Sequence, residues 1–477
     1  MKNLTTFWIL KTLALFTFSI SAPTVWAAPQ PRPPQFVLLA FDGSLNLSMW
    51  DETLKFAKTN NVKLTYFLSG VYFLLDSNKK DYIEPTKGAG ISAIGFAGDS
   101  KKDLIARVDY VNKAYDSGHT IGSHANGHFD QSLWTMSEWE LEFQEFSHLI
   151  FDVYTQKGFG PIPNLPKNPY HFSPDQISGF RAPLLATNSG LYQILRKNKF
   201  QFDTSQTDEM DYWPVKTREL WNFPLAEVRI YGTGKPTLSM DYNFYYTQSG
   251  GNPDLKNAEV YRNQMYQTYM GYFYTNYYGN RAPVHIGHHF SQWNGGAYWR
   301  ALLDFTKTVC KMPEVKCVSY HSLLKFMNSL SPEQIAEYQL GNFPKLPIPP
   351  KAKKDILAVA PIDVHFNMQQ ISEQELALNI TGKDAHLFPK DSLYIWKLDN
   401  KEIFRSTKPK INFSRITKRQ KIDIAKLTAL LEFKGTELLR TSHIINIDDE
   451  TVFSLDLEDL EKRSSLGDLP EAHKTFN

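Results

Sequence analysis

The sequence has little cysteine and no excess of one charge. Only Cys310 and Cys317 occur among 477 residues, so at most one disulfide can form within the chain. The 52 basic and 50 acidic residues nearly balance. This balance argues against the strongly positive surface that nucleic-acid-binding proteins present to phosphate groups. We therefore expect no nucleic acid among the partners of this protein.

Apolar runs long enough to cross a membrane are also lacking. The first 27 residues have Lys2, an apolar run from Leu13 to Ile20, and Val25-Trp26-Ala27 before Ala28. This pattern is typical of a secretory signal peptide cleaved after Ala27. Lys11 interrupts the apolar stretch, so a permanent anchor is the lesser alternative. We expect a periplasmic or secreted protein with no stable membrane span after signal cleavage.

Export bears on the two cysteines. Cys310 and Cys317 have six residues between them, and a disulfide persists in an oxidising compartment. We expect them to be bonded, and two free buried thiols are the alternative. Closing so short a loop contributes roughly 2–3 kcal/mol in the chain-entropy model.

Polar side chains follow a series of short apolar strands. The run Phe36–Phe41 ends at Asp42, and later expected strands end at His124, Arg181 and Asp203. The carboxyl ends of parallel strands share one edge of a sheet, so we expect these four side chains on one rim. Strands alternate with helical patterns over about 300 residues, which predicts an α/β barrel or a partial barrel.

Several local signals place further elements. Ser137 with Glu140 predicts a capping box for a helix that runs toward Tyr154, and Asn188 predicts the cap of the next helix. Residues 318–320 have the pattern of a strand. Residues 76–100 are irregular and contain Gly and Lys, which predicts a surface insertion.

His124 and His128 form the clearest metal-binding pattern in the chain. Neutral imidazole is a common zinc ligand, and residues four apart on one helical turn point to the same side. Two histidines at this spacing also recur by chance in cores and on surfaces. The pair therefore indicates a metal site only together with other residues.

A proline-dense, basic stretch at 344–351 divides the chain. Beyond it, short alternating runs predict an Ig-like β-sandwich of about 100 residues. We expect five segments, which are a signal peptide at 1–27, the barrel at 28–335, a Pro-rich linker at 336–355, a β-sandwich accessory domain at 356–460 and an acidic tail at 461–477.

Taken together, the residues at the strand ends resemble the polysaccharide deacetylases of carbohydrate esterase family four, which deacetylate chitin and peptidoglycan. The resemblance covers residues of about 36–330 and implies a distorted, incomplete (β/α) barrel. The family motifs are TFDD, H(S/T)xxH, RxPY, an Asp/Trp motif and LxH. They correspond in order to Ala40–Gly43, His124–His128, Arg181–Leu184, Asp203 with downstream aromatics, and Ile286–His288.

The resemblance also implies catalytic roles. Asp42 would be the general base, and His288 the general acid, with His289 as the alternative. Arg181 would orient Asp42, and Asp203 would hold the acid histidine in its useful tautomer. The alternative for Arg181 and Asp203 is a buried ion pair with no role in the chemistry.

Zinc is the cofactor that the resemblance implies, with His124 and His128 as ligands. The family's third ligand, the second Asp of TFDD, is Gly43 here, so the third protein ligand is uncertain. Asp42, Asp130, Ser44 or water could complete the shell.

Two further departures from the motifs are smaller. Leu184 replaces the Tyr of RxPY, whose backbone N–H would be the oxyanion donor, and Leu can still donate it. Ala125 replaces the hydroxyl residue that usually follows the first histidine.

The aromatic residues Trp293 and Tyr242 are candidates for a substrate groove, and packing against the barrel is the alternative for the tyrosines of this region. The expected function is that of an exported metal-dependent N-deacetylase, acting on N-acetylglucosamine residues of peptidoglycan or a chitin-like polysaccharide. The alternative is a catalytically weakened or inactive glycan-binding relative, because of Gly43.

Overall fold

The computed structural model describes residues 31–159, 168–359, 365–372, 375–381, 392–398, 401–412, 424–433 and 436–446. The signal peptide expected at 1–27 and the acidic tail expected at 461–477 lie outside these residues. Within the described ranges, no helix is both long enough and apolar enough to cross a bilayer.

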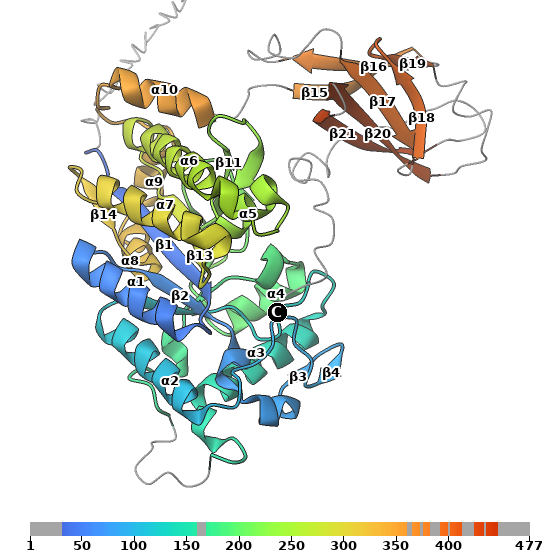
Figure 1. The fold of residues 1–477 in the computed structure, drawn as a ribbon. Helices are drawn as coiled ribbons and strands as arrows, with labels where there is room; N and C mark the ends of the chain where they lie inside the picture. Colours follow the sequence, from blue (N-terminus) through green and yellow to red (C-terminus); the bar gives the residue numbers. More distant parts are fainter. Residues whose placement is uncertain are drawn as a thin grey trace, which may run out of the picture.

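An open, curled sheet forms the centre of the first domain (Figure 1). Its strands follow the order β13-β1-β2-β5-β6-β7-β10-β9, and β14 also pairs with β1. The pairs from β13 to β10 are parallel, as expected for an incomplete (β/α) barrel. The strands are β1 (Gln35–Gly43), β2 (Thr65–Leu68), β5 (Thr120–Ser123), β6 (Gly179–Phe180), β7 (Phe202–Asp203), β9 (Val215–Thr217), β10 (Leu220–Asn222), β13 (Val284–His289) and β14 (Val315–Cys317).

Helices cover the outer face of this sheet (Figure 1). They are α1 (Leu47–Asn60), α2 (Lys101–Asp116), α3 (Met136–Phe151), α4 (Ser189–Lys197), α6 (Ala258–Tyr278) and α7 (Trp293–Val309). Helix α8 (Tyr320–Asn328) instead packs on the inner face, where its buried side chains share a core with Phe36 and Leu38 of β1. A small second sheet contains β8 (Thr207–Asp208), β11 (Leu225–Arg229) and β12 (Pro236–Leu238), and α5 (Asp241–Ser249) follows it.

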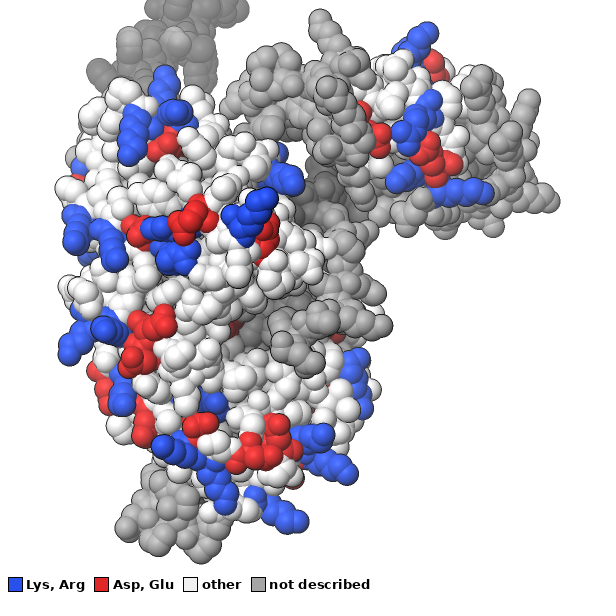
Figure 2. All heavy atoms as spheres, viewed as in Figure 1, with Lys and Arg blue, Asp and Glu red and all other residues white. Residues whose placement is uncertain are grey.

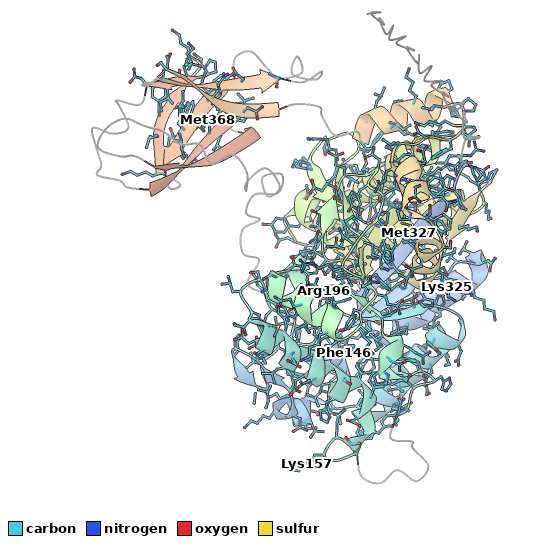
Figure 3. The ribbon with its side chains drawn as sticks, turned by 180° about the vertical axis from the view of Figure 1, so that it is seen from behind. Phe146, Lys157, Arg196, Lys325, Met327 and Met368 are labelled. Carbon is cyan, nitrogen blue, oxygen red and sulfur yellow. A yellow bond between two sulfur atoms is a disulfide. The ribbon has the colours of Figure 1, made fainter. Side chains whose placement is uncertain are left out.

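The side chains of β1 alternate between two cores. Val37, Leu39 and Phe41 belong to the core under the helices, whereas Phe36, Leu38 and Ala40 belong to the core inside the curled sheet. Because strand side chains alternate with a period of two, Asp42 faces the inside. Figure 3 labels Phe146 of the first core and Met327 of the second.

Two local predictions were wrong. Thr135 with Glu138, and not Ser137 with Glu140, forms the capping box of α3. Residues 318–320 are not a strand, because β14 ends at Cys317 and Tyr320 starts helix α8. Asn188 caps α4 as predicted, since its side chain accepts a hydrogen bond from the N–H of Leu191.

The insertion at 76–100 is more than a surface loop. It contains the short strands β3 (Ile83–Glu84) and β4 (Gly88–Ala89), and Tyr82 is fully buried. The Tyr82 hydroxyl donates to Glu142 of α3 at 3.0 Å. The N–H of Ala93 donates to the carbonyl of Gly127 at 2.8 Å, so the insertion is bonded to the segment that carries the two histidines.

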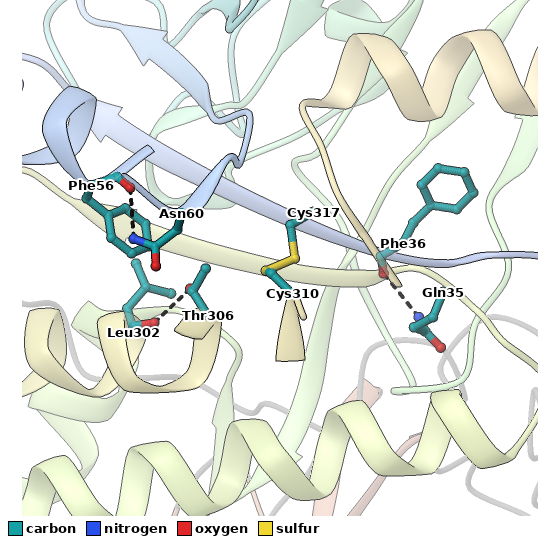
Figure 4. Close-up of a disulfide and its surroundings, with 8 residues drawn as sticks. All are labelled: Gln35, Phe36, Phe56, Asn60, Leu302, Thr306, Cys310 and Cys317. Carbon is teal, nitrogen blue, oxygen red and sulfur yellow. Dashed lines mark hydrogen bonds between the residues drawn. A yellow bond between two sulfur atoms is a disulfide. The ribbon is translucent and has the colours of Figure 1, made fainter. Parts of the chain in front are cut away.

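The predicted disulfide between Cys310 and Cys317 is confirmed, and their Cα atoms lie 5.7 Å apart (Figure 4). It joins the end of α7 to β14, the strand beside β1. The loop that it closes carries Glu314, whose carboxylate pairs with Arg32 and with the buried Arg281, each at 2.7 Å. The disulfide therefore fixes a charged cluster at the amino end of the sheet.

Much of the expected linker is helical. Helix α9 (Pro332–Gln339) begins before it, and α10 (Pro350–Val359) packs on α6. Gly271 of α6 allows this close approach, because a Cβ atom there would lie 2.4 Å from Val359. Residues 350–359 thus belong to the first domain.

The described part of the C-terminal region is all β. Its strands are β15 (His365–Ser372), β16 (Glu375–Thr381) and β19 (Lys410–Asn412) in one antiparallel sheet, and β17 (Leu393–Leu398), β18 (Lys401–Ser406), β20 (Ile424–Phe433) and β21 (Thr436–Asn446) in another. Met368 (Figure 3) and Trp396 come from different sheets and share one core, as in a sandwich. The Ig-like topology stays a prediction.

Charged side chains of both signs are interspersed on the face that Figure 2 shows. No large patch of one sign is visible there among the described residues, in agreement with the balanced composition.

Candidate active site

Asp42 and Arg181 form a buried ion pair at the carboxyl end of the sheet. Asp42 ends β1, and Arg181 directly follows β6. Nη1 of Arg181 donates to both carboxylate oxygens of Asp42, at 3.0 and 3.2 Å. The exposed fractions of the two side chains are 2% for Asp42 and 0% for Arg181. Each charge therefore depends on the other for compensation inside the protein.

The segment after β7 fixes Arg181 and the loop behind it. Nε of Arg181 donates to Oγ1 of Thr204 at 2.7 Å. The N–H of Ala182 donates to Oγ of Ser205 at 2.7 Å, and Ser205 Oγ donates to Asp203 at 2.5 Å. Burial raises the pKa of Asp203 to about 6, against the hydrogen bonds from Ser205 that lower it.

His124 and His128 lie in a loop, and not on one turn of a helix. Ala125 has φ 51° and His128 has φ 59°, so the backbone turns through the left-handed region twice. Their ring centroids are 5.2 Å apart. The expected proximity of the two rings is present, but it comes from this loop and not from helical spacing.

The tautomer of His124 follows from its partner. Nδ1 lies 2.8 Å from the carbonyl oxygen of Arg181, which can only accept, so Nδ1 carries the proton. Burial lowers the pKa of His124, and burial together with His124 and His289 lowers the pKa of His128 to about 3. Both imidazoles are neutral at pH 7, and Nε2 of His124 keeps a lone pair for a ligand.

The donor set of the described residues does not fit a zinc site with three protein ligands. No group of three or more His, Cys, Asp or Glu side chains in these ranges could hold a metal ion. Gly43 has no side chain, both oxygens of Asp42 bond Arg181, and Asp130 is exposed and caps the N–H of Ser132. Ser44 has a buried hydroxyl without a partner. Two imidazoles therefore remain without a third His, Cys, Asp or Glu ligand in the described ranges.

His289, and not His288, faces Asp42. In the parallel register of β1 and β13, Asp42 is directly opposite His289. His288 instead points under the helices, where its Nε2 lies 3.4 Å from the hydroxyl of Tyr269. Burial lowers the pKa of His288 to about 4. This register favours His289, the alternative, over His288 as the candidate acid, and the role of either residue stays a prediction.

Asp241 holds His289 from α5. Met240 pairs with Gly287 of β13, which brings Asp241 beside His289. One carboxylate oxygen accepts from Nδ1 of His289 at 2.7 Å, and the other accepts from its backbone N–H at 3.0 Å. Burial would lower the pKa of His289, but Asp241 and Asp42 outweigh it and raise the pKa. Nδ1 of His289 is thus bonded to Asp241, and no residue in the described ranges hydrogen-bonds its Nε2.

The expected partner of the acid histidine, Asp203, serves a different group. Among the described residues it accepts from Ser205 and, at 3.4 Å, from the hydroxyl of Tyr192. It therefore orients the Arg181 loop, and the histidine is oriented by Asp241.

Aromatic rings border His289. The Trp293 ring centroid lies 5.3 Å from that of His289 and the Tyr242 centroid lies 6.2 Å from it. Trp293 stacks on Tyr245 at 5.2 Å with an interplanar angle of 6°, so one of its faces is occupied. Leu184, the expected oxyanion residue, is 58% exposed and has φ 55° on the loop after Arg181.

Comparison with protein families identifies the first part of this arrangement. Residues 30–159, from just before β1 to just beyond α3, match the family model of the polysaccharide deacetylases. The protein has a polysaccharide deacetylase domain. The match includes Asp42, His124 and His128, whereas Arg181, Asp241 and His289 follow it in the chain.

Solved structures with a similar fold include proteins from three bacteria. A proposed polysaccharide deacetylase of Mycobacterium smegmatis is 12% identical, with 64% of this chain and 97% of that chain covered and a TM-score of 0.40. The polysaccharide deacetylase Bc1974 of Bacillus cereus is 16% identical, with 62% of this chain and 95% of that chain covered and a TM-score of 0.31. A family four pseudoenzyme of Bacillus anthracis is 10% identical, with 62% of this chain and 69% of that chain covered and a TM-score of 0.33. Comparison with curated proteins returns no match. Identity this low says nothing about what the deacetylase domain hydrolyses or binds.

Asp241 is a candidate site residue that the motifs did not single out. The signal was present, because Asp241 is followed directly by the aromatic Tyr242, whereas Asp203 is followed by Thr204. An Asp next to an aromatic residue suits the Asp/Trp motif better than Asp203 does.

Proposed function

We propose that this protein is an exported hydrolase that removes acetyl groups from N-acetylglucosamine residues of peptidoglycan or a chitin-like polysaccharide. One observation carries the proposal. Asp42 and His289 are opposite each other on neighbouring strands, and each is held by its own charged partner, Arg181 or Asp241. This is the arrangement that a general base and a general acid need on two sides of one bond.

Amide hydrolysis needs one group that takes a proton from water and one that gives a proton to the leaving amine. The Asp42 carboxylate, oriented by Arg181, takes the proton. His289 bonds Asp241 through Nδ1, so its Nε2 is the atom that protonates the amine. The backbone N–H of Leu184 is the proposed donor to the oxyanion.

The resemblance to family four implies zinc, which as a bound ion would polarise the acetyl carbonyl. Two imidazoles do not make a complete set of protein ligands, so no step above depends on the ion. Whether His124 and His128 hold a divalent ion strongly enough to affect turnover is therefore a variable in the test.

The test is acetate release by residues 28–477 from purified peptidoglycan and from chitin oligomers, with added zinc and with chelator. We expect release by the native chain and a loss of about 10²–10⁴-fold in kcat for His289→Gln. The control is His288→Gln, because this neighbouring histidine is opposite Phe41 and not Asp42, although its Nδ1 lies 3.5 Å from the Asp241 carboxylate. We expect a smaller loss for this variant than for His289→Gln. If His289→Gln released acetate at the native rate, the acid role would be wrong.

A glycan-binding protein without turnover is the second candidate, and Gly43 favours it, because the family's third metal ligand is missing there. In that case no acetate is released from either polymer, although the folded chain still sediments with glycan in the presence of chelator. Acetate release by the native chain would contradict this candidate.

A further inference from the structure

A second line of buried polar groups continues from Arg181 into the interior of the curled sheet. Nη1 and Nε of Arg181 bond Asp42 and Thr204, but Nη2 is buried and has no partner within hydrogen-bonding geometry. A guanidinium nitrogen can only donate, and a buried donor without an acceptor is costly. A polar group beside Nη2 that can accept a hydrogen bond therefore matters for how firmly Arg181 is held.

Tyr320 is the candidate for that group. It is fully buried at the start of α8, and its ring stacks at 5.5–5.7 Å on Phe202, Phe223 and His285. Burial raises the pKa of Tyr320 to about 12, while the positive charge of Arg181 beside it lowers that pKa. Both side chains also lie against Phe67: the guanidinium carbon of Arg181 is 4.8 Å from the centroid of that ring, and the Tyr320 ring centroid is 6.1 Å from it.

His285 determines which way the Tyr320 hydroxyl points. Its Nδ1 lies 3.1 Å from the hydroxyl oxygen. Burial, with a smaller contribution from Arg181, lowers the pKa of His285 to about 3, so the ring is neutral and one of its nitrogens accepts. When the hydroxyl donates its proton to Nδ1 of His285, its oxygen lone pairs remain for Arg181, which carries no acceptor atom of its own.

We propose that Tyr320 is a positioning residue for the catalytic base: its hydroxyl oxygen, with His285 as the acceptor behind it, supplies the lone pair toward which Nη2 of Arg181 is held, and so restrains the guanidinium that orients Asp42. This inference rests on the proposed function only where turnover is measured. Gly287 contributes space on the other side of the same guanidinium, since a Cβ atom there would lie 3.2 Å from Nη1 of Arg181.

The test is Tyr320→Phe, which keeps the ring stack and removes only the hydroxyl. The matched control is Tyr66→Phe, because Tyr66 is also fully buried, its hydroxyl donates to Thr53 at 3.0 Å, and its ring lies in the core under the helices, on the other face of the sheet from Asp42. For Tyr320→Phe we expect kcat to fall about 10- to 100-fold with KM within about twofold, since misplacement of a catalytic group affects mainly the chemical step. A kcat equal to that of Tyr66→Phe would overturn the proposal.

A second measurement does not need turnover. Denaturant unfolding of the full chain gives a double-mutant cycle between Tyr320→Phe and Asp42→Asn, and another between Tyr66→Phe and Asp42→Asn. We expect the first cycle to be non-additive and the second to be additive. Additivity in the first cycle would refute the coupling, whereas a non-additive cycle in a chain that releases no acetate would leave the coupling intact and refute the proposed function alone.

Discussion

Gly43→Asp is the substitution that tests the missing metal ligand most directly, and its effect on stability can be worked out from the backbone. Gly43 has φ +100°, a conformation that side chains other than glycine rarely adopt. An added Cβ atom would meet only Tyr72 Cε2 within 4 Å, at an ordinary contact distance of 3.6 Å. The cost therefore comes from the backbone and not from a clash.

Backbone strain of this kind costs about 1–3 kcal/mol, and replacing glycine recovers about 0.4–1 kcal/mol through the unfolded chain. We therefore expect Gly43→Asp and Gly43→Ala both to lower the free energy of unfolding by about 1–2 kcal/mol in chelator. Zinc at 100 times its dissociation constant would add about 2.7 kcal/mol to a chain that binds it only when folded. This gain should occur in Gly43→Asp alone.

The assay is denaturant unfolding of the native chain and both variants, with zinc and with chelator. Gly43→Ala is the control, since it carries the backbone cost without the carboxylate. If Gly43→Ala were as stable as the native chain, the strain argument would be wrong. If zinc stabilised all three proteins equally, another group would already complete the site, and the assignment of only two protein ligands would be refuted.

Two further substitutions test the catalytic half of the site. Asp241→Asn removes the charge that raises the pKa of His289. A general acid must be protonated, so activity is lost as pH rises through the pKa of that acid. The alkaline limb of the pH profile of kcat should therefore move to lower pH in this variant. An unchanged limb would mean that another group supplies the proton. Gly287→Ala should lower kcat for acetate release at least tenfold. The added Cβ atom would lie 2.6 Å from Met240 Cε and 3.2 Å from Nη1 of Arg181, so it would displace the guanidinium. Native turnover would show that both side chains can move aside.

Most of the fold could be predicted, because apolar runs and the polar residues that end strands can be recognised from neighbouring residues in the sequence. The alternation along β1 already places Asp42 with Phe36, Leu38 and Ala40, on the inner face. What a single sequence could not give is the register between strands far apart in the chain. The choice between His288 and His289 depends on that register, since a shift by one residue moves a side chain to the other face of the sheet.

Contacts between residues far apart in the sequence could not be predicted for the same reason. Asp241 reaches His289 because Met240 pairs with Gly287, and no local pattern predicts this pairing. The His124–His128 loop shows a different limit, because its ring proximity depends on two residues with positive φ and not on helical spacing. Spacing predicted that the two rings meet, but not the geometry by which they do.

The two halves of the acid–base pair differ in how much they reveal about function. Removing one partner of a buried ion pair costs about 3–5 kcal/mol, so the Asp42–Arg181 pair has a sufficient explanation in stability alone. The His289 side chain is 24% exposed, and in the described structure its Nε2 has no hydrogen-bond partner, so folding does not require a free imidazole nitrogen there. Loss of activity in Asp42→Asn would therefore be ambiguous between misfolding and chemistry. His289→Gln, in a chain that unfolds at the same denaturant concentration as the native protein, would separate the two.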